Sequence, residues 1–366
     1  MRIGLDATPL LGSRTGIGRY VEELVQGLAR VAPEDDRVLT AFTVRGAAPL
    51  ADVPGVEVRH RRAPARLLQR SWQTLGWPPV EVLSGRVDVF HGTNFVLPPL
   101  RRARGVVTVH DLSYLRHADT VEAATLRYRE LVPQSVRRAS AVCVLSAAMA
   151  EEVQEEYGVA EDLIVVTSPG VGAGFLTAEP ASPAWLAERG LPTRFALFVG
   201  SREPRKGLPV LLEAWARLWR TGAAPPLCLV GPPGWGPALD VSGLPAQAVV
   251  LPGFLSSEDL PRVVASADLL AMPSRYEGFG IPPIEALAAG TPVVVSDLRV
   301  MRDNLGPHAR YAAVGDAESL ADALQAALRD GRGSEADRAA RREQVAGFTW
   351  DACALAARRA YSLALS

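Results

Sequence analysis

Residues 269–285 read LLAMPSRYEGFGIPPIE, a short apolar run followed by a glycine loop and two prolines. The run 269–272 is apolar on both faces, which is typical of a strand in a buried parallel sheet. Pro282 and Pro283 preset the φ angle that begins a helix, and Gly290 is well placed to end it. The stretch therefore predicts a strand, a loop and a helix in direct succession, the repeating part of a βαβ fold.

The same alternation of apolar runs and helical patterns continues along most of the chain. Val21, Leu24, Val25 and Leu28, for example, fall on one face of a helix. Strands that are apolar on both faces and separated by helices indicate parallel sheets in α/β domains. Two such sets predict two Rossmann-like domains that face each other across an interdomain cleft, with ligands beyond the carboxyl ends of the strands. The other expected strands are residues 106–109, 141–145, 164–166, 195–199, 227–230, 249–251 and 293–295.

Glu277 and Glu285 stand on either side of the glycine loop. A helix that opens directly from such a loop points free N–H groups and a positive dipole end at its ligand, which suits a phosphate or diphosphate. Phosphate repels the two carboxylates, but sugar and ribose hydroxyls donate hydrogen bonds to them. The spacing therefore predicts a nucleotide-sugar site. The alternative is an ordinary strand-to-helix loop with two solvated glutamates.

Composition excludes several other classes of protein. A chain of 366 residues has room for about two domains. The net charge of −1 argues against nucleic-acid binding, which usually needs a basic excess. Cys143, Cys228 and Cys353 are too few and too far apart for a disulfide framework or a zinc site. We see no signal peptide and no apolar run of about 18–20 residues, so we expect a soluble cytoplasmic enzyme.

Two histidines follow apolar runs in the first half of the chain. His110 ends the run 106–109 and is expected beside the cleft, where its imidazole can hydrogen-bond a sugar hydroxyl or settle charge near a reacting carbon. Asp111 is expected to fix the orientation of that ring. His91 follows the run 87–90 and is assigned to the acceptor side. The alternative for each histidine is a buried structural role.

Basic and glycine-rich loops complete the expected diphosphate site. Arg202, Arg205 and Lys206 follow the run 195–199, where cations can neutralise a departing diphosphate, although the loop can also be merely solvated. The loop with Gly16 and Gly18 lacks the third glycine of a dinucleotide fingerprint, so we expect its amides to meet a phosphate or the acceptor. No Asp-x-Asp and no metal-ligand spacing occurs, so we expect neither a metal nor a cofactor.

The segment 59–70 is basic and continues into apolar residues such as Trp72 and Trp77. Such a segment can rest on an anionic membrane surface, which would place the protein peripherally at the inner face of the membrane, or bind an acidic acceptor. The alternative is a solvated face with ordinary packing beside it.

In order and spacing, these motifs resemble the family 4 glycosyltransferases of the GT-B fold nearly from end to end. The resemblance implies an N-terminal acceptor-side domain at 1–175, a C-terminal nucleotide-sugar domain at 176–347, and a helix at 348–366 that crosses back to the first domain. The motifs that carry it are Arg14–Tyr20, His91–Phe95, His110-Asp111, Glu203–Lys206, Gly253-Phe254, Glu277 with Glu285, and Phe348–Trp350.

The resemblance implies transfer of a hexose from a nucleotide diphosphate sugar, with retention of configuration and without a metal. Glu285 would then hold the ribose, Glu277 the donor sugar and Lys206 the diphosphate, with His110 beside the reacting carbon. Retention is usually explained by front-face attack, with the leaving phosphate assisting deprotonation of the acceptor. Further donor-side residues are Gly16, Gly18, Arg202, Arg205, Gly253, Phe254, Ser274, Gly278, Phe279, Gly280 and Ile281; acceptor-side residues are Arg19, His91, Asn94 and Asp111.

Two departures from the family pattern matter. Ser201 stands where many members have Arg, so Arg202 or Arg205 is expected to supply that cation. This run looks like the mannosyltransferase branch, which favours GDP-mannose as donor. Gly172 stands where Asp is common. The acceptor is open between a glycan, a lipid-linked intermediate and a small natural product. Alternative functions are a nucleotide-sugar epimerase, a phosphorylase, or a binding protein without catalysis.

Overall fold

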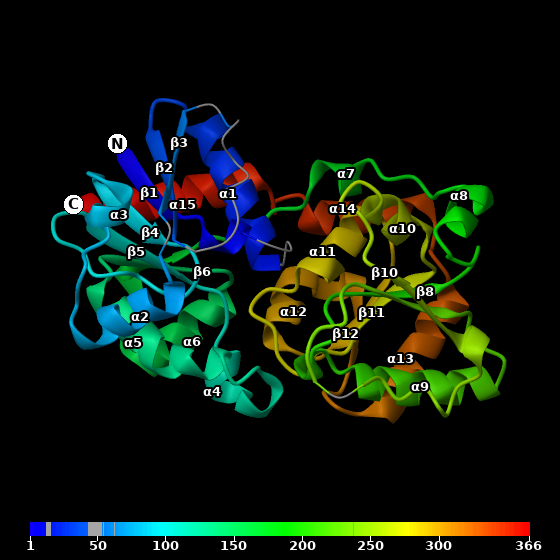
Figure 1. Cartoon of the computed structure of the whole chain (residues 1–366). Coiled ribbons are helices and arrows are strands. Elements are labelled where there is room, and N and C mark those ends of the chain that lie inside the picture. The colour runs from blue at the N-terminus through cyan, green and yellow to red at the C-terminus, as the bar shows by residue number, and fades with distance from the viewer. Residues whose placement is uncertain (12–15, 43–52, 54, 62, 237) are drawn as a thin grey trace. The chain divides into compact units, whose positions relative to one another are not determined.

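The computed structural model describes residues 1–11, 16–42, 53, 55–61, 63–236 and 238–366, which form two compact units (Figure 1). Unit 1 consists of Met1–Leu115, Ala123–Gly170 and Phe348–Ser366; unit 2 consists of Arg116–Glu122 and Val171–Gly347. The boundary that we expected after residue 175 lies after Gly170. The short segment 116–122, which we placed in the first domain, belongs with unit 2.

The described part of unit 1 contains a seven-stranded parallel sheet in the order β3-β2-β1-β4-β5-β6-β7. The strands are β1 (Arg2–Asp6), β2 (Asp36–Phe42), β3 (Val56–Arg61), β4 (Val89–Gly92), β5 (Arg104–Val109), β6 (Ala141–Val144) and β7 (Ile164–Val166). The helices are α1 (Gly16–Val31), α2 (Ala65–Thr74), α3 (Glu81–Ser84), α4 (Ser113–Arg116), α5 (Tyr128–Arg138), α6 (Ala147–Tyr157) and α15 (Trp350–Leu365).

Unit 2 contains a six-stranded parallel sheet in the order β10-β9-β8-β11-β12-β13 among its described residues. The strands are β8 (Ala196–Val199), β9 (Leu227–Val230), β10 (Val249–Gly253), β11 (Leu269–Met272), β12 (Val293–Ser296) and β13 (Ala309–Ala312). The helices are α7 (Ala173–Leu176), α8 (Pro183–Glu188), α9 (Leu208–Arg220), α10 (Leu260–Ser266), α11 (Ile281–Ala288), α12 (Arg299–Leu305), α13 (Ala317–Asp330) and α14 (Glu335–Val345).

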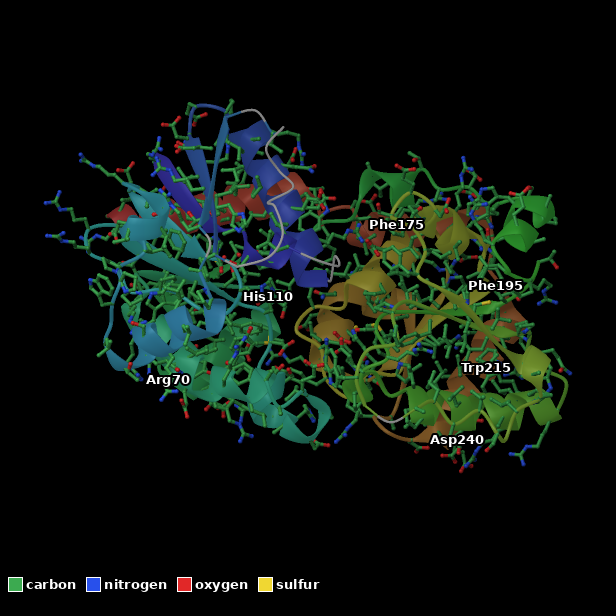
Figure 2. All side chains as sticks on the ribbon, viewed as in Figure 1. Arg70, His110, Phe175, Phe195, Trp215 and Asp240 are labelled. Carbon is green, nitrogen blue, oxygen red and sulfur yellow. The ribbon has the colours of Figure 1, made fainter. Side chains whose placement is uncertain are left out.

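Two Rossmann-like domains are thus confirmed, and the apolar runs identified most of their strands. Buried side chains from strands and helices fill the core of each unit; Phe195 and Trp215 are wholly buried in unit 2 (Figure 2). The strands β2, β3 and β13 were missed, because polar residues interrupt their apolar runs. In the described part of the chain no helix combines the length and the apolar character needed to cross a bilayer.

The C-terminal helix α15 packs within unit 1, beside α1 and the strands β5, β6 and β7 (Figure 1). Small residues allow this close approach: a Cβ on Gly27 of α1 would lie 2.9 Å from the Trp350 carbonyl oxygen. The Thr349 hydroxyl caps the helix by accepting a hydrogen bond from the Ala352 amide. The chain therefore returns to its first domain at its end, as the family resemblance implied.

The strand order reverses direction once in each sheet. In unit 1 the reversal lies between β1 and β4, and in unit 2 it lies between β8 and β11. The loops that leave two such strands run to opposite sides and leave a crevice at the carboxyl ends, where α/β proteins bind ligands. Each unit therefore has one position where a site is expected from topology alone.

Candidate functional site

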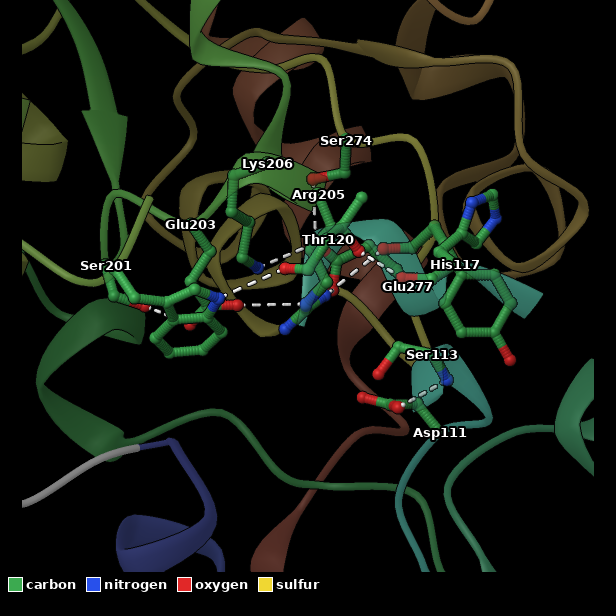
Figure 3. Close-up of polar contacts among 12 residues, drawn as sticks. Asp111, Ser113, His117, Thr120, Ser201, Glu203, Arg205, Lys206, Ser274 and Glu277 are labelled. Atoms are coloured by element: carbon green, nitrogen blue, oxygen red, sulfur yellow. Dashed lines mark hydrogen bonds and ion pairs between the residues drawn. The ribbon is translucent and has the colours of Figure 1, made fainter. Parts of the chain in front are cut away.

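In unit 2 the crevice between β8 and β11 holds a cluster of charged side chains centred on Glu277 (Figure 3). Lys206 Nζ donates a hydrogen bond to Glu277 Oε1 at 2.7 Å, and the Ser274 hydroxyl donates to the same oxygen at 2.7 Å. The Arg205 guanidinium lies 3.1 Å from Glu277 Oε2. The structure thus brings together four residues that the sequence assigned to the donor site.

Local backbone geometry explains why Lys206 reaches this position. Lys206 ends a short 3-10 turn, and Gly207 follows it with φ at +70°. A Cβ on Gly207 would collide with the carbonyl oxygen of Pro273, which directly follows β11. The two loops can therefore approach each other only because residue 207 is glycine, and this close approach places Lys206 against Glu277.

The charges of the cluster keep Glu277 ionised. Burial by itself raises the pKa of this carboxyl, but the neighbouring Lys206 and Arg205 outweigh burial and bring the pKa from 4.5 to about 2. At neutral pH Glu277 is therefore a carboxylate that accepts hydrogen bonds, such as those of sugar hydroxyls. It is not an acid that donates a proton.

Lys206 is the only lysine in a sequence with 39 lysines and arginines in total. A lysine carries a compact charge with three donors, whereas arginine presents a wide planar fork. The Lys206 side chain is almost fully buried, and its compact ammonium group lies against the Glu277 carboxylate. A single lysine among so many arginines is a signal in the sequence itself, beside its position after a strand.

A second carboxylate holds Arg205 in place. Arg205 Nε donates to Glu203 Oε2 at 3.0 Å, and its terminal nitrogen donates to the Tyr276 carbonyl at 3.2 Å. The Ser201 hydroxyl donates to the other oxygen of Glu203. Arg202, by contrast, makes no side-chain hydrogen bond or ion pair with any described residue. Arg205 is therefore engaged by its neighbours in the cluster, whereas Arg202 is not, and which of the two arginines meets a diphosphate stays a prediction.

The glycine loop and the helix α11 form as the sequence predicted. Gly280 stands just before α11 with φ at +88°, and a Cβ there would lie 2.6 Å from Met301 Cε. The Asn304 side-chain amide donates to the Phe279 carbonyl at 2.9 Å and so anchors the loop. Glu285 is buried on the second turn of α11. Gly278, Phe279, Gly280 and Ile281 all belong to this loop and helix start.

Residues 116–122, which the sequence analysis did not single out, contact residues just before the same loop. Asp119 forms an ion pair with Arg275 at 3.0 Å, and the His117 ring lies 5.2 Å from the Tyr276 ring. Trp235 Nε1 donates to the Thr120 carbonyl at 3.1 Å. These contacts join residues more than 100 positions apart, so no local pattern in the sequence signals them.

Gly253 and Phe254 lie elsewhere in unit 2. They stand at the end of the edge strand β10, which β9 separates from β8. Gly253 has φ at +84°, and the Phe254 side chain is 71% exposed. The structure does not place these two residues in the Glu277 cluster, and their role in donor binding stays a prediction.

In unit 1, His110 follows β5 and is almost completely buried. Its Nε2 donates to the Thr93 carbonyl at 2.8 Å, and Tyr20 and Phe95 contact its ring edge to face. Burial lowers the pKa of His110 to about 4, so the ring is neutral at pH 7. The orientation that we expected from Asp111 comes from Thr93, because Asp111 instead accepts the amide hydrogen of Ser113 at 2.9 Å.

His91 lies inside β4, not beyond its end as we had placed it. Its two ring nitrogens bond to the hydroxyls of Tyr361, at 2.8 Å, and Thr108, at 2.7 Å. Burial lowers its pKa to about 3. The ring therefore ties β4 to α15 and β5, which is the structural role that we had kept as the alternative.

The remaining expected residues of unit 1 lie on several elements. Gly16, Gly18 and Arg19 form the first turn of α1, whereas residues 12–15 of that glycine loop lie outside the described residues. Asn94 follows β4. In the basic segment 59–70, residues 59–61 belong to β3 and residue 62 lies outside the described residues. Membrane contact through this segment stays a prediction.

No cluster of three or more His, Cys, Asp or Glu side chains with the geometry to hold a metal occurs among the residues that the structure describes. Whether the activity needs a metal stays a prediction.

Comparisons with known proteins add family information to this geometry. The family model "Glycosyl transferases group 1" matches residues 187–344, and "Glycosyltransferase Family 4" matches residues 14–173. The O-antigen chain mannosyltransferase B of Escherichia coli is 30% identical over 391 aligned residues, which cover 99% of this chain and 100% of the relative.

Solved structures are similar over almost the whole chain. Sucrose-phosphate synthase from Thermosynechococcus elongatus matches with a TM-score of 0.79 at 21% identity and covers 99% of this chain and 98% of its own. Anabaena HepE, solved in complex with UDP-glucose, matches with a TM-score of 0.64 at 19% identity, over 99% and 96% of the two chains. At these identities the two structures show a shared fold.

Proposed function

We propose a specific reaction for this chain, which belongs to the group 1 glycosyl transferases and has the GT-B fold. In this proposal the protein transfers mannose from GDP-mannose to a hydroxyl of a glycan, with retention of configuration. The observation that carries the proposal is the Lys206–Glu277 pair in the crevice between β8 and β11. A buried cation next to a buried carboxylate offers one group for a diphosphate and one for sugar hydroxyls.

The donor choice rests on two observations. The relative that is 30% identical over the whole chain is a mannosyltransferase by name. The run Ser201 to Lys206 also looks like the mannosyltransferase branch of the family. Both observations favour mannose and, with it, GDP as the nucleotide. The relative's name includes O-antigen chain, which favours a glycan over a small natural product as acceptor.

The proposed reaction breaks one bond of the donor and forms one bond to the acceptor. The bond between the anomeric carbon and the diphosphate oxygen breaks, and Lys206 with Arg202 neutralises the charge that develops on that oxygen. The acceptor oxygen bonds to the anomeric carbon from the same face, and its proton passes to the departing phosphate oxygen. Glu277 holds the sugar hydroxyls and Glu285 the ribose hydroxyls. His110 is neutral at pH 7 and gives its Nε2 hydrogen to Thr93, so its Nδ1 accepts a hydrogen bond from a sugar hydroxyl.

A thermal-shift panel with GDP, UDP, ADP and dTDP tests the donor, and proton NMR of the product with GDP-mannose tests the transfer. We expect GDP to give the largest rise in Tm and the product to carry the anomeric configuration of the donor. Inverted product would refute retention, and a larger shift with UDP would refute GDP. A donor-only NMR time course without conversion would separate the transferase from an epimerase.

The single lysine permits a direct test of the site. A GDP analogue with pyridoxal esterified to its terminal phosphate carries an aldehyde beyond the diphosphate; this aldehyde forms a Schiff base with a nearby amine, and borohydride reduction makes the bond permanent. We expect peptide mapping to find the label on Lys206 and unmodified GDP to prevent it. Labelling confined to the N-terminal amine, which is the other amine in the chain, would contradict the assignment of Lys206.

A further inference from the structure

Helix α12 packs beside α11 in unit 2, and two of its side chains contact the glycine loop that precedes α11 (Figure 1). Met301 lies against Gly280, where a Cβ would be 2.6 Å from Met301 Cε and 2.9 Å from its Sδ. Asn304 Nδ2 donates a hydrogen bond to the Phe279 carbonyl at 2.9 Å. Met301 and Asn304 are three positions apart, so they lie on one face of α12. This face therefore holds two successive residues of the loop.

The end of α12 that carries Asn304 is itself anchored. Asn304 is only 6% exposed. Its backbone carbonyl is among the last of the helix, which have no partner within it, and accepts a hydrogen bond from Gln344 Nε2 of α14 at 3.2 Å. Directly after the helix, the Gly306 carbonyl accepts a hydrogen bond from the Tyr311 hydroxyl at 2.6 Å. The side-chain amide of Asn304 therefore acts from a fixed position.

The hydrogen bond from Asn304 sets the direction of one N–H group in the loop. The Phe279 carbonyl and the Gly280 N–H belong to the same planar peptide unit. This unit is trans, because the bond between Trp77 and Pro78 is the only cis peptide bond among the described residues. In a trans unit the C=O and N–H groups point in opposite directions. The Phe279 carbonyl points at Asn304, so the Gly280 N–H points away from it.

The Gly280 N–H makes no hydrogen bond with any described residue, although Gly280 is buried. Buried backbone N–H groups almost always have a partner. The loop begins at Glu277, which Lys206 contacts, and it leads into the first turn of α11, where the helix dipole favours an anion. An anionic oxygen of a ligand would satisfy the Gly280 N–H, and the diphosphate of the proposed donor carries such oxygens.

We propose that Asn304 is a positioning residue of the donor site, which holds the Phe279 carbonyl and thereby directs the Gly280 N–H at an oxygen of the donor diphosphate. Asn304 acts through the loop and does not contact the donor itself. The identity of the ligand rests on the proposed transferase function. The role of Asn304 adds to that function a residue on α12 that strengthens the hold on the diphosphate and leaves the hold on the nucleoside unchanged.

The variants Asn304→Asp and Asn304→Leu test the proposal, with Asp303→Asn as the matched control. Asn304→Asp keeps the shape of the side chain and replaces the donating group with an oxygen that repels the Phe279 carbonyl. Asn304→Leu keeps most of the volume and has no donor. Asp303→Asn makes the reverse exchange at the neighbouring position of α12, where the side chain is 46% exposed and pairs with Arg299.

Titration calorimetry with GDP and with guanosine separates positioning from folding. We expect GDP to bind both Asn304 variants about tenfold more weakly than the wild type and the control, which corresponds to about 1.4 kcal/mol. Guanosine has no phosphate and should bind all four proteins equally. An equal loss for GDP and guanosine would leave Asn304 with a structural role alone and overturn the proposal. GDP affinity equal to that of Asp303→Asn would overturn it as well. If one Asn304 variant does not fold, the other decides.

Pyrophosphate separates this proposal from the assignment of the donor. It carries the diphosphate without a nucleoside, so we expect it to raise the Tm of the wild type and of Asp303→Asn more than that of either Asn304 variant. If GDP, UDP, ADP and dTDP all fail to bind the wild type, the proposed transferase function fails, and pyrophosphate then decides the role of Asn304. An equal rise in Tm in all four proteins, or no rise in any of them, would overturn that role.

Discussion

The stability of unit 2 should depend on Lys206, and the variant Lys206→Met tests this. The change keeps most of the side-chain volume and removes the charge, so that Glu277 is left buried with one cation fewer. Its partners lower the pKa of Glu277 from 4.5 to about 2, and a difference of about 2.5 units corresponds to about 3 kcal/mol. Removing one partner of a buried ion pair typically costs about 3–5 kcal/mol, a similar range.

A loss of about 3 kcal/mol should lower Tm by about 6–12 °C in a domain of this size. Because the pKa of Glu277 is depressed by folding, the stabilisation is complete above pH 4.5 and is lost as the pH falls toward 2. Thermal unfolding followed by circular dichroism at pH 7, 5 and 3 should therefore show a gap between wild type and Lys206→Met that narrows at the lowest pH.

The control for this experiment is Arg217→Met. Arg217 pairs with Glu213 on the exposed face of α9 at 3.0 Å, and a surface pair of this kind contributes about 0.3–0.5 kcal/mol. We expect the control to change Tm by no more than about 2 °C. A Lys206→Met variant as stable as the control at pH 7, or a gap that stays constant down to pH 3, would refute the reasoning.

Three further predictions follow from the same structure. Arg202→Ala should weaken GDP binding about tenfold or more with little change in Tm, whereas Arg205→Ala should lower Tm because it breaks the contacts with Glu203 and Glu277. Titration calorimetry with GDP and thermal unfolding of both variants check this, and the reverse pattern would assign the diphosphate to Arg205. Burial raises the pKa of Asp6 to about 6, so the folded state loses stability as this carboxyl ionises. Between about pH 4 and about pH 6 the free energy of unfolding of the wild type should fall by about 3 kcal/mol relative to that of Asp6→Asn. Parallel urea titrations that show no such fall would contradict the burial of this carboxyl. Transfer activity should survive dialysis against EDTA, and activity lost there and restored by magnesium would disprove metal independence.

Local sequence patterns predicted the parts of the fold that depend on neighbouring residues. The run 269–272 became β11, and Pro282, Pro283 and Gly290 placed the start and end of α11 correctly. The strand β2 escaped detection because it starts with two charged residues and Thr40 interrupts its short apolar run, and β3 because it contains only two apolar residues, Val56 and Val58.

Residues of the candidate site were predictable by type and less so by partner. Position at a strand end singled out Lys206 and Glu277, since parallel strands end at one edge of the sheet. No spacing rule distinguished Arg202 from Arg205, because the difference lies in the contact of Arg205 with Glu203 and Glu277. Asp6 went unnoticed since an acidic residue at a strand end gives no sign of its burial.

The sequence by itself determined the two parallel sheets, the glycine loop before α11 and the family of this protein, because each depends on residue types at short, regular spacings. Only the tertiary structure decided which groups pair with which. In the folded protein His91 lies in the core, and Arg205 forms ion pairs with two carboxylates. Asp6, Gln69 and Asn94 line one cavity. The physical reason is that burial and charge pairing depend on distances between residues far apart in the chain, and those distances exist only after the sheets have formed.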